Sequence, residues 1–164
     1  MTYPSEIITG DVLSVDLPAQ SVDLIVTSPP YNLGIAYDGI SDDMPWGDYL
    51  LWSQSWLQRC YGWARPGGRL CMNVPLDISR DGGQPVMADL VRVASQAGWR
   101  YRSTIVWNEG NVSRRTAWGS WMSASAPHVI APVEVIVMMY RDTWRRQREG
   151  ESDITREEFM EIGR

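Results

Sequence analysis

The spacing of apolar residues divides the chain into short strands alternating with helices. Apolar runs bounded by polar residues, Gly or Pro predict strands at residues 7–8, 21–27, 69–74, 100–107 and 133–140. Apolar residues three and four positions apart predict two helices, at 46–64 and 84–97. This alternation indicates an α/β fold in which βαβ units build a mostly parallel sheet.

Both predicted helices have recognisable ends and an apolar stripe. Asp42 or Asp43 can begin the first helix, and Pro66-Gly67-Gly68 can end it. Its predicted buried face consists of Leu50, Leu57, Tyr61 and Ala64. Gly98 ends the second helix, whose stripe consists of Val86, Leu90, Val93, Ala94 and Ala97.

The last two predicted strands, 100–107 and 133–140, are expected to form an antiparallel hairpin at the edge of the sheet. The connection between them, residues 108–132, is long, and long connections without structure of their own are often functional. It carries Arg114, Arg115 and Trp118, residue types suited to phosphate contacts and base stacking. The alternative is a surface loop whose tryptophans pack against the sheet.

The most distinctive segment is Thr27-Ser28-Pro29-Pro30-Tyr31-Asn32, which directly follows the apolar run 22–26. Two consecutive prolines donate no backbone hydrogen bonds and hold φ at about −65°, so the strand must end in a stiff turn. In open α/β sheets, ligands bind beyond the carboxyl ends of the strands. The Ser28 hydroxyl, the carbonyl oxygens and the flat ring of Tyr31 suit a planar group with an exocyclic NH2, such as a nucleobase.

Ser28-Pro29-Pro30-Tyr31 resembles the catalytic motif of the DNA amino-methyltransferases, which methylate cytosine N4 or adenine N6 with S-adenosylmethionine. Flanking segments are similar to further motifs of that family: the lead-in at 7–11 and 17–25, the Pro-Gly-Gly turn at 65–70 and the strand end at 105–111. Glu109 stands where a lysine is commoner in the family. The motif order resembles the β-class arrangement, and the resemblance covers residues 6–141.

The resemblance implies a Rossmann-like methyltransferase sheet and assigns roles to several residues. The Ser28 side chain and the Pro29 carbonyl would accept hydrogen bonds from the target amino group, Pro30 would stiffen the turn, and Tyr31 would stack on the extruded base. Asp11 matches the family position near the adenine of S-adenosylmethionine. The alternative for Asp11 is an ordinary Asx-type turn.

The resemblance also bears on completeness and domain organisation. The family's Gly-rich cofactor loop is not found in this sequence, and in the β-class order it lies C-terminal to all the motifs present. The expectation is therefore the N-terminal catalytic portion of a methyltransferase, residues 1–141, with loop 108–132 facing DNA. Residues 142–164 would begin a truncated target-recognition or linker segment, and whether this chain alone is active is left open.

Several functions remain open from the residues alone. Ser at the first motif position resembles the cytosine-N4 enzymes more than the adenine-N6 enzymes, where Asp is usual. Cytosine-N4 methylation of DNA within restriction-modification is therefore the expectation, and adenine-N6 methylation is the alternative. A methyltransferase acting on protein or RNA nitrogens more often carries Asn-Pro-Pro-Tyr. A non-catalytic nucleic-acid-binding fragment is the third reading.

Charge distribution qualifies the expected partner, double-stranded DNA. The net charge of the 164-residue chain is −5, whereas nucleic-acid binders usually carry a basic surface. All cationic side chains are arginines. Between positions 110 and 148 the sequence has six arginines and only two acidic residues. Such a local basic segment can contact phosphates. The alternative for 141–148 is a solvated helix face or loop, and a homodimer is also left open.

The remaining composition indicates a globular domain, with 44% hydrophobic and 21% charged residues. Cys60 and Cys71 lack metal-ligand spacing, and with the single His128 they predict no metal site. They are expected to be reduced thiols in a cytoplasmic protein. No apolar run is long enough for a membrane span, so no membrane association is expected.

Overall fold

The computed structural model describes residues 5–37, 40–78, 82–108, 133–145 and 154–162, with the backbone alone at 36–37 and 40–41. Its elements, in chain order, are β1 (Val22–Thr27), β2 (Ala36–Tyr37), β3 (Ile40–Ser41), α1 (Trp46–Trp63), β4 (Ala64–Pro75), α2 (Val86–Gln96), β5 (Arg100–Asn108), β6 (Val133–Tyr140) and α3 (Arg156–Ile162).

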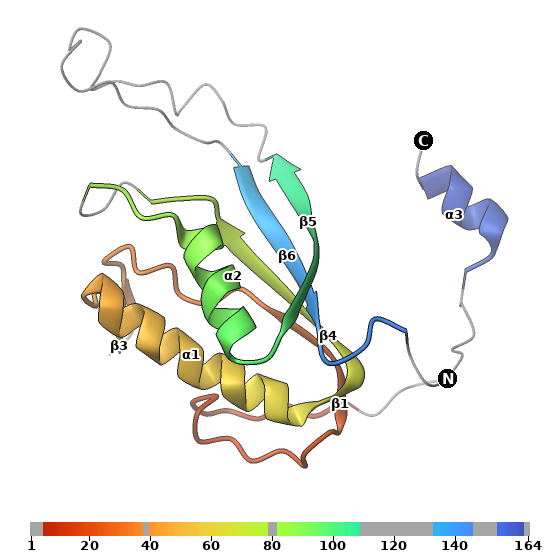
Figure 1. The fold of residues 1–164 in the computed structure, drawn as a ribbon, viewed down its shortest axis with the longest axis horizontal. Helices are drawn as coiled ribbons and strands as arrows, with labels where there is room; N and C mark the ends of the chain where they lie inside the picture. The colour runs from red at the N-terminus through yellow and green to blue at the C-terminus, as the bar shows by residue number, and fades with distance from the viewer. Residues whose placement is uncertain (1–4, 38–39, 79–81, 109–132, 146–153, 163–164) are drawn as a thin grey trace, which may run out of the picture.

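Four of the strands form one sheet in the order β1-β4-β6-β5 (Figure 1). The β1–β4 pairing is parallel, whereas β6 runs antiparallel to both β4 and β5. The predicted α/β class and the antiparallel hairpin at the sheet edge are confirmed. Because β6 turns back from β5 and enters between β5 and β4, the sheet is mixed. Strands β2 and β3 form a separate two-stranded antiparallel pair.

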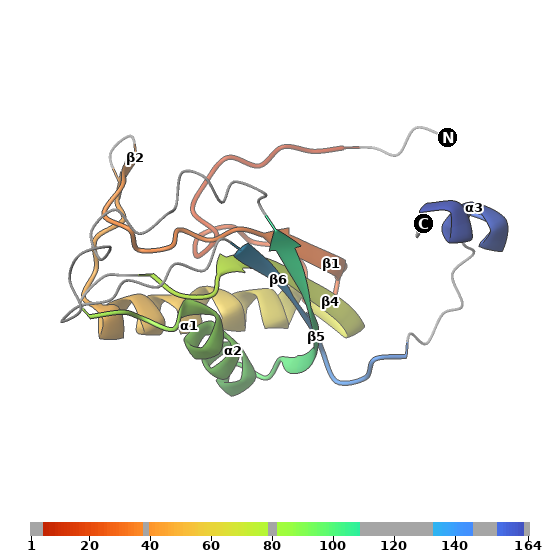
Figure 2. The same cartoon turned by 90° about the horizontal axis from the view of Figure 1, so that it is seen from above.

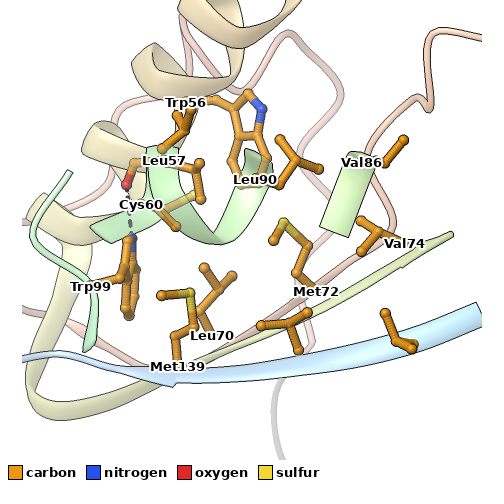
Figure 3. Packing of buried hydrophobic residues seen from close by; sticks show 14 of the residues in the cluster. Trp56, Leu57, Cys60, Leu70, Met72, Val74, Val86, Leu90, Trp99 and Met139 are labelled. Atoms are coloured by element: carbon orange, nitrogen blue, oxygen red, sulfur yellow. Dashed lines mark hydrogen bonds between the residues drawn. The ribbon is translucent and has the colours of Figure 1, made fainter. Parts of the chain in front are cut away.

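Helices α1 and α2 lie on the same side of the sheet, as Figure 2 shows. Alternate residues of the two central strands point toward them and are buried: Leu70, Met72 and Val74 of β4, and Val135, Val137 and Met139 of β6. Figure 3 shows Leu57, Cys60 and Leu90 of the helices packed over this layer. Trp99 completes the core, and its indole N–H donates to the Leu57 carbonyl over 3.1 Å.

The buried face of α1 differs in part from the prediction. Leu57 is buried as expected, but Leu50 and Tyr61 are only partly buried, and Ala64 begins β4. Large aromatic side chains occupy most of the buried face: Tyr49, Trp56 and Trp63, together with Ser53 and Cys60. Because burying these rings removes more apolar area from water, the helix is rotated about its axis so that they face the core.

The ends of α1 also correct the prediction. Pro45 precedes the helix without a side-chain cap, because the Asp42 side chain bonds elsewhere. The helix ends at Trp63, and Pro66-Gly67-Gly68 lies inside β4, where the pairing with β1 shifts register. The guanidinium of Arg141 donates to the carbonyls of Tyr61 and Ala64, over 2.8 and 2.6 Å, and so caps this end of the helix. This structural role replaces the predicted solvated face for Arg141.

Helix α2 agrees closely with the prediction. Val86, Leu90, Val93 and Ala94 are buried, and Ala97 is partly buried just beyond the helix. Gly98 follows with φ +107°, where a Cβ atom would lie 2.9 Å from Cζ of Tyr61. Only glycine fits both the backbone conformation and the contact with the ring.

Two further differences concern the ends of the chain. The strand predicted at 7–8 is wrong: these residues have no regular structure, and Ile7 is 93% exposed. Two residues without a partner strand cannot hold a β conformation. Helix α3, which the sequence analysis did not anticipate, begins with a capping box in which Thr155 Oγ1 accepts from the Glu158 N–H.

Candidate functional site

The diproline turn lies at the C-terminal end of β1, next to the parallel strand β4. Ser28 and Pro30 are exposed, Pro29 is buried, and Tyr31 is partly buried. The structure therefore brings the four predicted catalytic residues together at a surface-accessible edge of the sheet. A ligand can reach the Ser28 hydroxyl from solvent.

Asp42 and Asn32 lock the chain directly after this turn. Asn32 is 1% exposed and has φ +61°, a conformation that Asn tolerates better than most residues. Its backbone N–H and that of Leu33 donate to the two Asp42 carboxylate oxygens over 2.8 and 3.0 Å. The Asn32 side chain exchanges two hydrogen bonds with the backbone of Met44. These bonds anchor Asp42 and Met44 to the backbone directly after the turn.

Helix α1 braces the turn through Tyr49. The Tyr49 hydroxyl donates to the Pro30 carbonyl over 2.8 Å. Burial is the main cause that raises the pKa of Tyr49, so the hydroxyl keeps its proton across the neutral range. A protonated phenol is what this hydrogen bond requires, and the brace is present at any physiological pH.

A hydrogen-bonded group of four side chains, Ser28, Tyr31, Asn73 and Glu134, surrounds the Tyr31 hydroxyl. The hydroxyl oxygens of Ser28 and Tyr31 lie 2.7 Å apart. Asn73 Nδ2 donates to the Tyr31 oxygen over 3.1 Å and also to Oε2 of Glu134. Oε2 of Glu134 lies 3.4 Å from the Tyr31 oxygen. We call these four residues the hydroxyl network.

Strand alternation explains why Asn73 and Glu134 meet. Asn73 of β4 pairs with Ile136 of β6, and Glu134 lies two residues before Ile136, on the same face. This face is opposite to the one that buries Met72 and Val135 against the helices. The two polar side chains therefore project from the helix-free face toward the turn after β1.

The network changes the acidity of Tyr31. Burial raises its pKa above the ordinary value, and the neighbouring Glu134 adds to this, whereas the hydrogen bonds with Ser28 and Asn73 act in the opposite direction. The net shift is upward. Tyr31 is therefore a neutral phenol at physiological pH, able both to donate and to accept.

An apolar groove of about 490 Å³ runs along β1 beside the turn. Trp52, Trp56 and Trp63 of α1 line one wall, β1 and residues 28–30 line another, and Val12 and Leu17 close it. Leu24 and Val26 of β1 are 51% and 73% exposed. The volume lies within the range of small-molecule sites.

Asp11 adopts the Asx-type turn that was the alternative to cofactor binding. Its Oδ1 accepts from the Leu13 N–H over 2.9 Å, and its carbonyl accepts from Ser14 and Val15. The side chain is nevertheless exposed, one residue from Val12 in the groove wall. The turn thus presents an acidic group next to the groove.

Arg114, Arg115 and Trp118 lie outside the described residues, as does His128. Among the residues that are described, no group of three or more His, Cys, Asp or Glu side chains could hold a metal ion. In the same part of the chain, no helix is long and apolar enough to cross a membrane. Both thiols are free, and burial raises the pKa of Cys60 to about 11.

Sequence reasoning did not identify Asp42, Tyr49, Asn73 or Glu134 as part of the site. Two of them carried a signal. Asn73 is polar near the end of the apolar strand 69–74, and Glu134 is the only charged residue within the apolar run 133–139. Polar residues at strand ends are where α/β sheets place their ligands. Asp42 and Tyr49 act through a packing arrangement that no local pattern indicates.

Comparisons with known proteins show the family to which this chain is similar. A family model described as DNA methylase matches residues 22–159. The Type II methyltransferase M.MjaVI of Methanocaldococcus jannaschii is 55% identical over 155 residues, which cover 94% of this chain and 80% of the relative. M.BglII of Bacillus subtilis is 30% identical over 106 residues, 63% of this chain and 29% of the relative.

Solved structures show the same fold. A Thermus thermophilus protein named as a DNA modification methylase, in complex with S-adenosyl-L-methionine, has a TM-score of 0.67 at 24% identity. The match covers 94% of this chain and 62% of that one. The cytosine-N4-specific PvuII DNA methyltransferase has a TM-score of 0.57 at 20% identity, covering 80% and 47%. The chain thus spans about half to two thirds of these structures.

The family match extends over most of the sequence, and it includes the diproline turn, both strands that carry the hydroxyl network and the hairpin at the sheet edge. The protein therefore belongs to the DNA methylase family of N6/N4 amino-methyltransferases, enzymes that take their methyl group from S-adenosylmethionine.

Proposed function

We propose that this chain holds the target base of a DNA methyltransferase that modifies the exocyclic amino group of cytosine at N4. The observation that carries the proposal is the accessible Ser28 hydroxyl on a diproline turn braced by α1. Adenine-N6 methylation is the second candidate, because the same acceptors suit either amino group. Ser28 at the first motif position favours cytosine.

The proposed chemistry starts from the weak nucleophilicity of an exocyclic amino nitrogen, whose lone pair is delocalised into the ring. Ser28 Oγ and the Pro29 carbonyl would accept hydrogen bonds from its two hydrogens. This favours a pyramidal nitrogen with a localised lone pair. Acceptors fixed in advance where positive charge develops stabilise the transition state by several kcal/mol, and the diproline turn keeps them fixed.

Tyr31 would stack on a base extruded from the duplex and thereby offset the few kcal/mol that extrusion costs. Its ring orientation is held at the hydroxyl by Ser28 and Asn73. No covalent intermediate with the protein is needed. The two thiols support this view, since burial keeps both Cys60 and Cys71 less acidic than an ordinary thiol, unlike an activated nucleophile.

The described residues fit part of an S-adenosylmethionine site. The groove beside the turn has aromatic walls, and the exposed Asp11 carboxylate at its margin can accept from hydroxyl or amino groups. We therefore assign Asp11 to cofactor binding. S-adenosylmethionine, when bound, supplies the electrophilic methyl group on sulfur.

Double-stranded DNA is the proposed substrate, in the cytoplasm and in the setting of restriction-modification. We assign Arg114, Arg115 and Trp118 to contacts with it, since their residue types suit phosphates and bases. Residues 1–141 would form the catalytic portion, with 108–132 facing DNA, and 142–164 would begin a recognition or linker segment. A homodimer is compatible with this arrangement.

The test is to express the full gene product in a host that lacks DNA amino-methylation, and to analyse digested host DNA by mass spectrometry. N4-methylcytosine is the expected product, and a Ser28→Ala variant should yield much less. N6-methyladenine would move the assignment to the second candidate. Methylation confined to RNA or protein would refute DNA as the substrate.

A further inference from the structure

The hydroxyl network raises a question about direction, because the Ser28–Tyr31 hydrogen bond can run either way. A Ser28 hydroxyl that donates to Tyr31 leaves its lone pairs facing outward. A Ser28 hydroxyl that accepts from Tyr31 has to point its own proton elsewhere. Only the first arrangement leaves Ser28 as a pure acceptor for an incoming amino group.

Asn73 and Glu134 constrain this direction. Asn73 Nδ2 lies within bonding distance of a Glu134 carboxylate oxygen, and a carboxylate can only accept. The amide nitrogen, and not its oxygen, must therefore face Glu134 and Tyr31. The second hydrogen of the amide nitrogen is then donated to the Tyr31 oxygen, which lies 3.1 Å from Nδ2. The Tyr31 oxygen already accepts one hydrogen bond before Ser28 is considered.

The Tyr31 proton has two acceptors within reach, Ser28 Oγ at 2.7 Å and Glu134 Oε2 at 3.4 Å. If it pointed at Ser28, the Tyr31 and Glu134 oxygens would face each other at 3.4 Å with no hydrogen between them, and their lone pairs would repel. If it points at Glu134, every close contact in the network has a donor and an acceptor. The negative charge of the carboxylate adds to this preference in a partly buried setting.

We propose that Glu134 is a positioning residue that sets the direction of the hydrogen bonds, from Ser28 through Tyr31 to Glu134, so that Ser28 presents only lone pairs to the target amino group. This inference rests on the proposed function for its meaning in catalysis, but the direction itself is a property of the free protein. Glu134 acts through Tyr31 and does not touch the base.

The proposal gives Tyr31 a second task besides stacking. Through hydrogen bonds, the Tyr31 hydroxyl links Glu134, on the helix-free face of β6, to Ser28 at the end of β1. It also explains why a charged residue occupies the otherwise apolar start of β6, next to the buried Val135. An ionised carboxylate only accepts hydrogen bonds, so Glu134 cannot reverse the chain of donors.

The direction can be observed by neutron diffraction of crystals exchanged into D2O, which locates the hydroxyl deuterons: the Tyr31 deuteron should point at Glu134 and the Ser28 deuteron at Tyr31. The coupling of Ser28 and Glu134 to Tyr31 is measured as a pKa change. Tyrosine is replaced throughout by difluorotyrosine, which moves phenol titration toward neutral pH, and each ring is followed by fluorine NMR. The Tyr31 signal is assigned by its loss in Tyr31→Phe. If Ser28 donates to Tyr31, Ser28→Ala removes a donor that stabilises the phenolate, so the pKa of Tyr31 rises by roughly 0.5 to 1 unit. Ser55→Ala, at an exposed serine on α1, is the matched control and leaves that pKa unchanged.

The role of Glu134 is tested in the same measurement. Glu134→Met removes the acceptor and the charge, so the pKa of Tyr31 falls and its proton turns to Ser28. In crystals of Glu134→Met, the Tyr31 deuteron should therefore point at Ser28 Oγ. Glu134→Gln keeps an acceptor oxygen and keeps the original direction. Glu134→Ala replaces the Met variant if that variant does not fold.

Two results would overturn the proposal: a Tyr31 deuteron that points at Ser28 in the wild type, or one whose direction does not change when the Glu134 acceptor is removed. Neither depends on methylation activity, so a failure of the proposed function leaves this test intact. In the complete enzyme, Glu134→Met should lower kcat about tenfold or more while KM for DNA changes little.

Discussion

The Tyr49 hydroxyl donates to the Pro30 carbonyl over 2.8 Å and thereby joins the buried face of α1 to the diproline turn. The bond links a residue of the core to a turn that has no N–H groups of its own at Pro29 and Pro30. The position of the proposed amino-group acceptors therefore depends on how the first turn of α1 packs.

Tyr49→Phe tests this link. The variant keeps the ring in the core but leaves the Pro30 carbonyl without its donor, so we expect a loss of about 1 kcal/mol in the free energy of unfolding. Methyl transfer should fall more than this loss of stability explains, because the turn is less rigid. Urea unfolding and initial rates measure the two effects. Tyr101→Phe, which removes an exposed hydroxyl bonded to Thr104, is the control and should change neither.

Two variants separate the contribution of the Tyr31 ring from that of its hydroxyl. Tyr31→Phe keeps a stacking surface and removes the hydroxyl network contacts, whereas Tyr31→Ala removes both. We expect turnover to fall in both variants and further in Tyr31→Ala, by the roughly 1–3 kcal/mol that base stacking contributes. Fluorescence of 2-aminopurine at the target position should report less base extrusion only in Tyr31→Ala. Equal extrusion in the two variants would remove the stacking role.

Gly98 offers a test of the core that is independent of function. Gly98→Ala places a Cβ atom 2.9 Å from the Tyr61 ring at φ +107°, so we expect destabilisation of roughly 1–3 kcal/mol. Gly62→Ala, in the last turn of α1, meets no atom within 4 Å and should be neutral or stabilising. The melting temperatures of the two variants should shift in opposite directions from that of the wild type, or differ from each other by several degrees. A Gly98→Ala protein as stable as the wild type would contradict the packing of Tyr61.

Cys60 predicts a loss of stability in alkaline solution. Burial raises the pKa of its thiol from near 9 to about 11, so the folded state holds this proton more tightly than the unfolded state. The contribution is complete below about pH 9 and is lost as the pH rises to about 11. The free energy of unfolding, measured with urea under reducing conditions, should fall more steeply with pH across this range for the wild type than for Cys60→Ala. Parallel slopes would show that the thiol titrates normally.

The elements of the fold were largely predictable because local patterns decide them. The stripe of α2 and the alternation of β6 leave few alternatives, and Gly98 marks its turn unambiguously. The buried face of α1 was harder, since apolar residues occur nearly all around that helix. Its orientation followed from the fit of Trp56 and Trp63 against the sheet, a tertiary effect.

The site was predictable only where it forms one continuous motif. Ser28 to Tyr31 could be identified because four neighbouring residues share one turn. Asn73 and Glu134 reach the same hydroxyl from two other strands, and their meeting depends on the register between β4 and β6. No single-sequence pattern specifies that register.

The alternation in β4 and β6 has a consequence for how this protein can change. Each strand buries one set of side chains against the helices, and from the other set Asn73 of β4 and Glu134 of β6 reach the turn that carries Ser28. Deleting a single codon in β4 would exchange the two sets, sending Asn73 inward and Met72 outward. A substitution here changes one of the two sets at a single position, whereas an insertion or deletion would abolish folding and methyl transfer together.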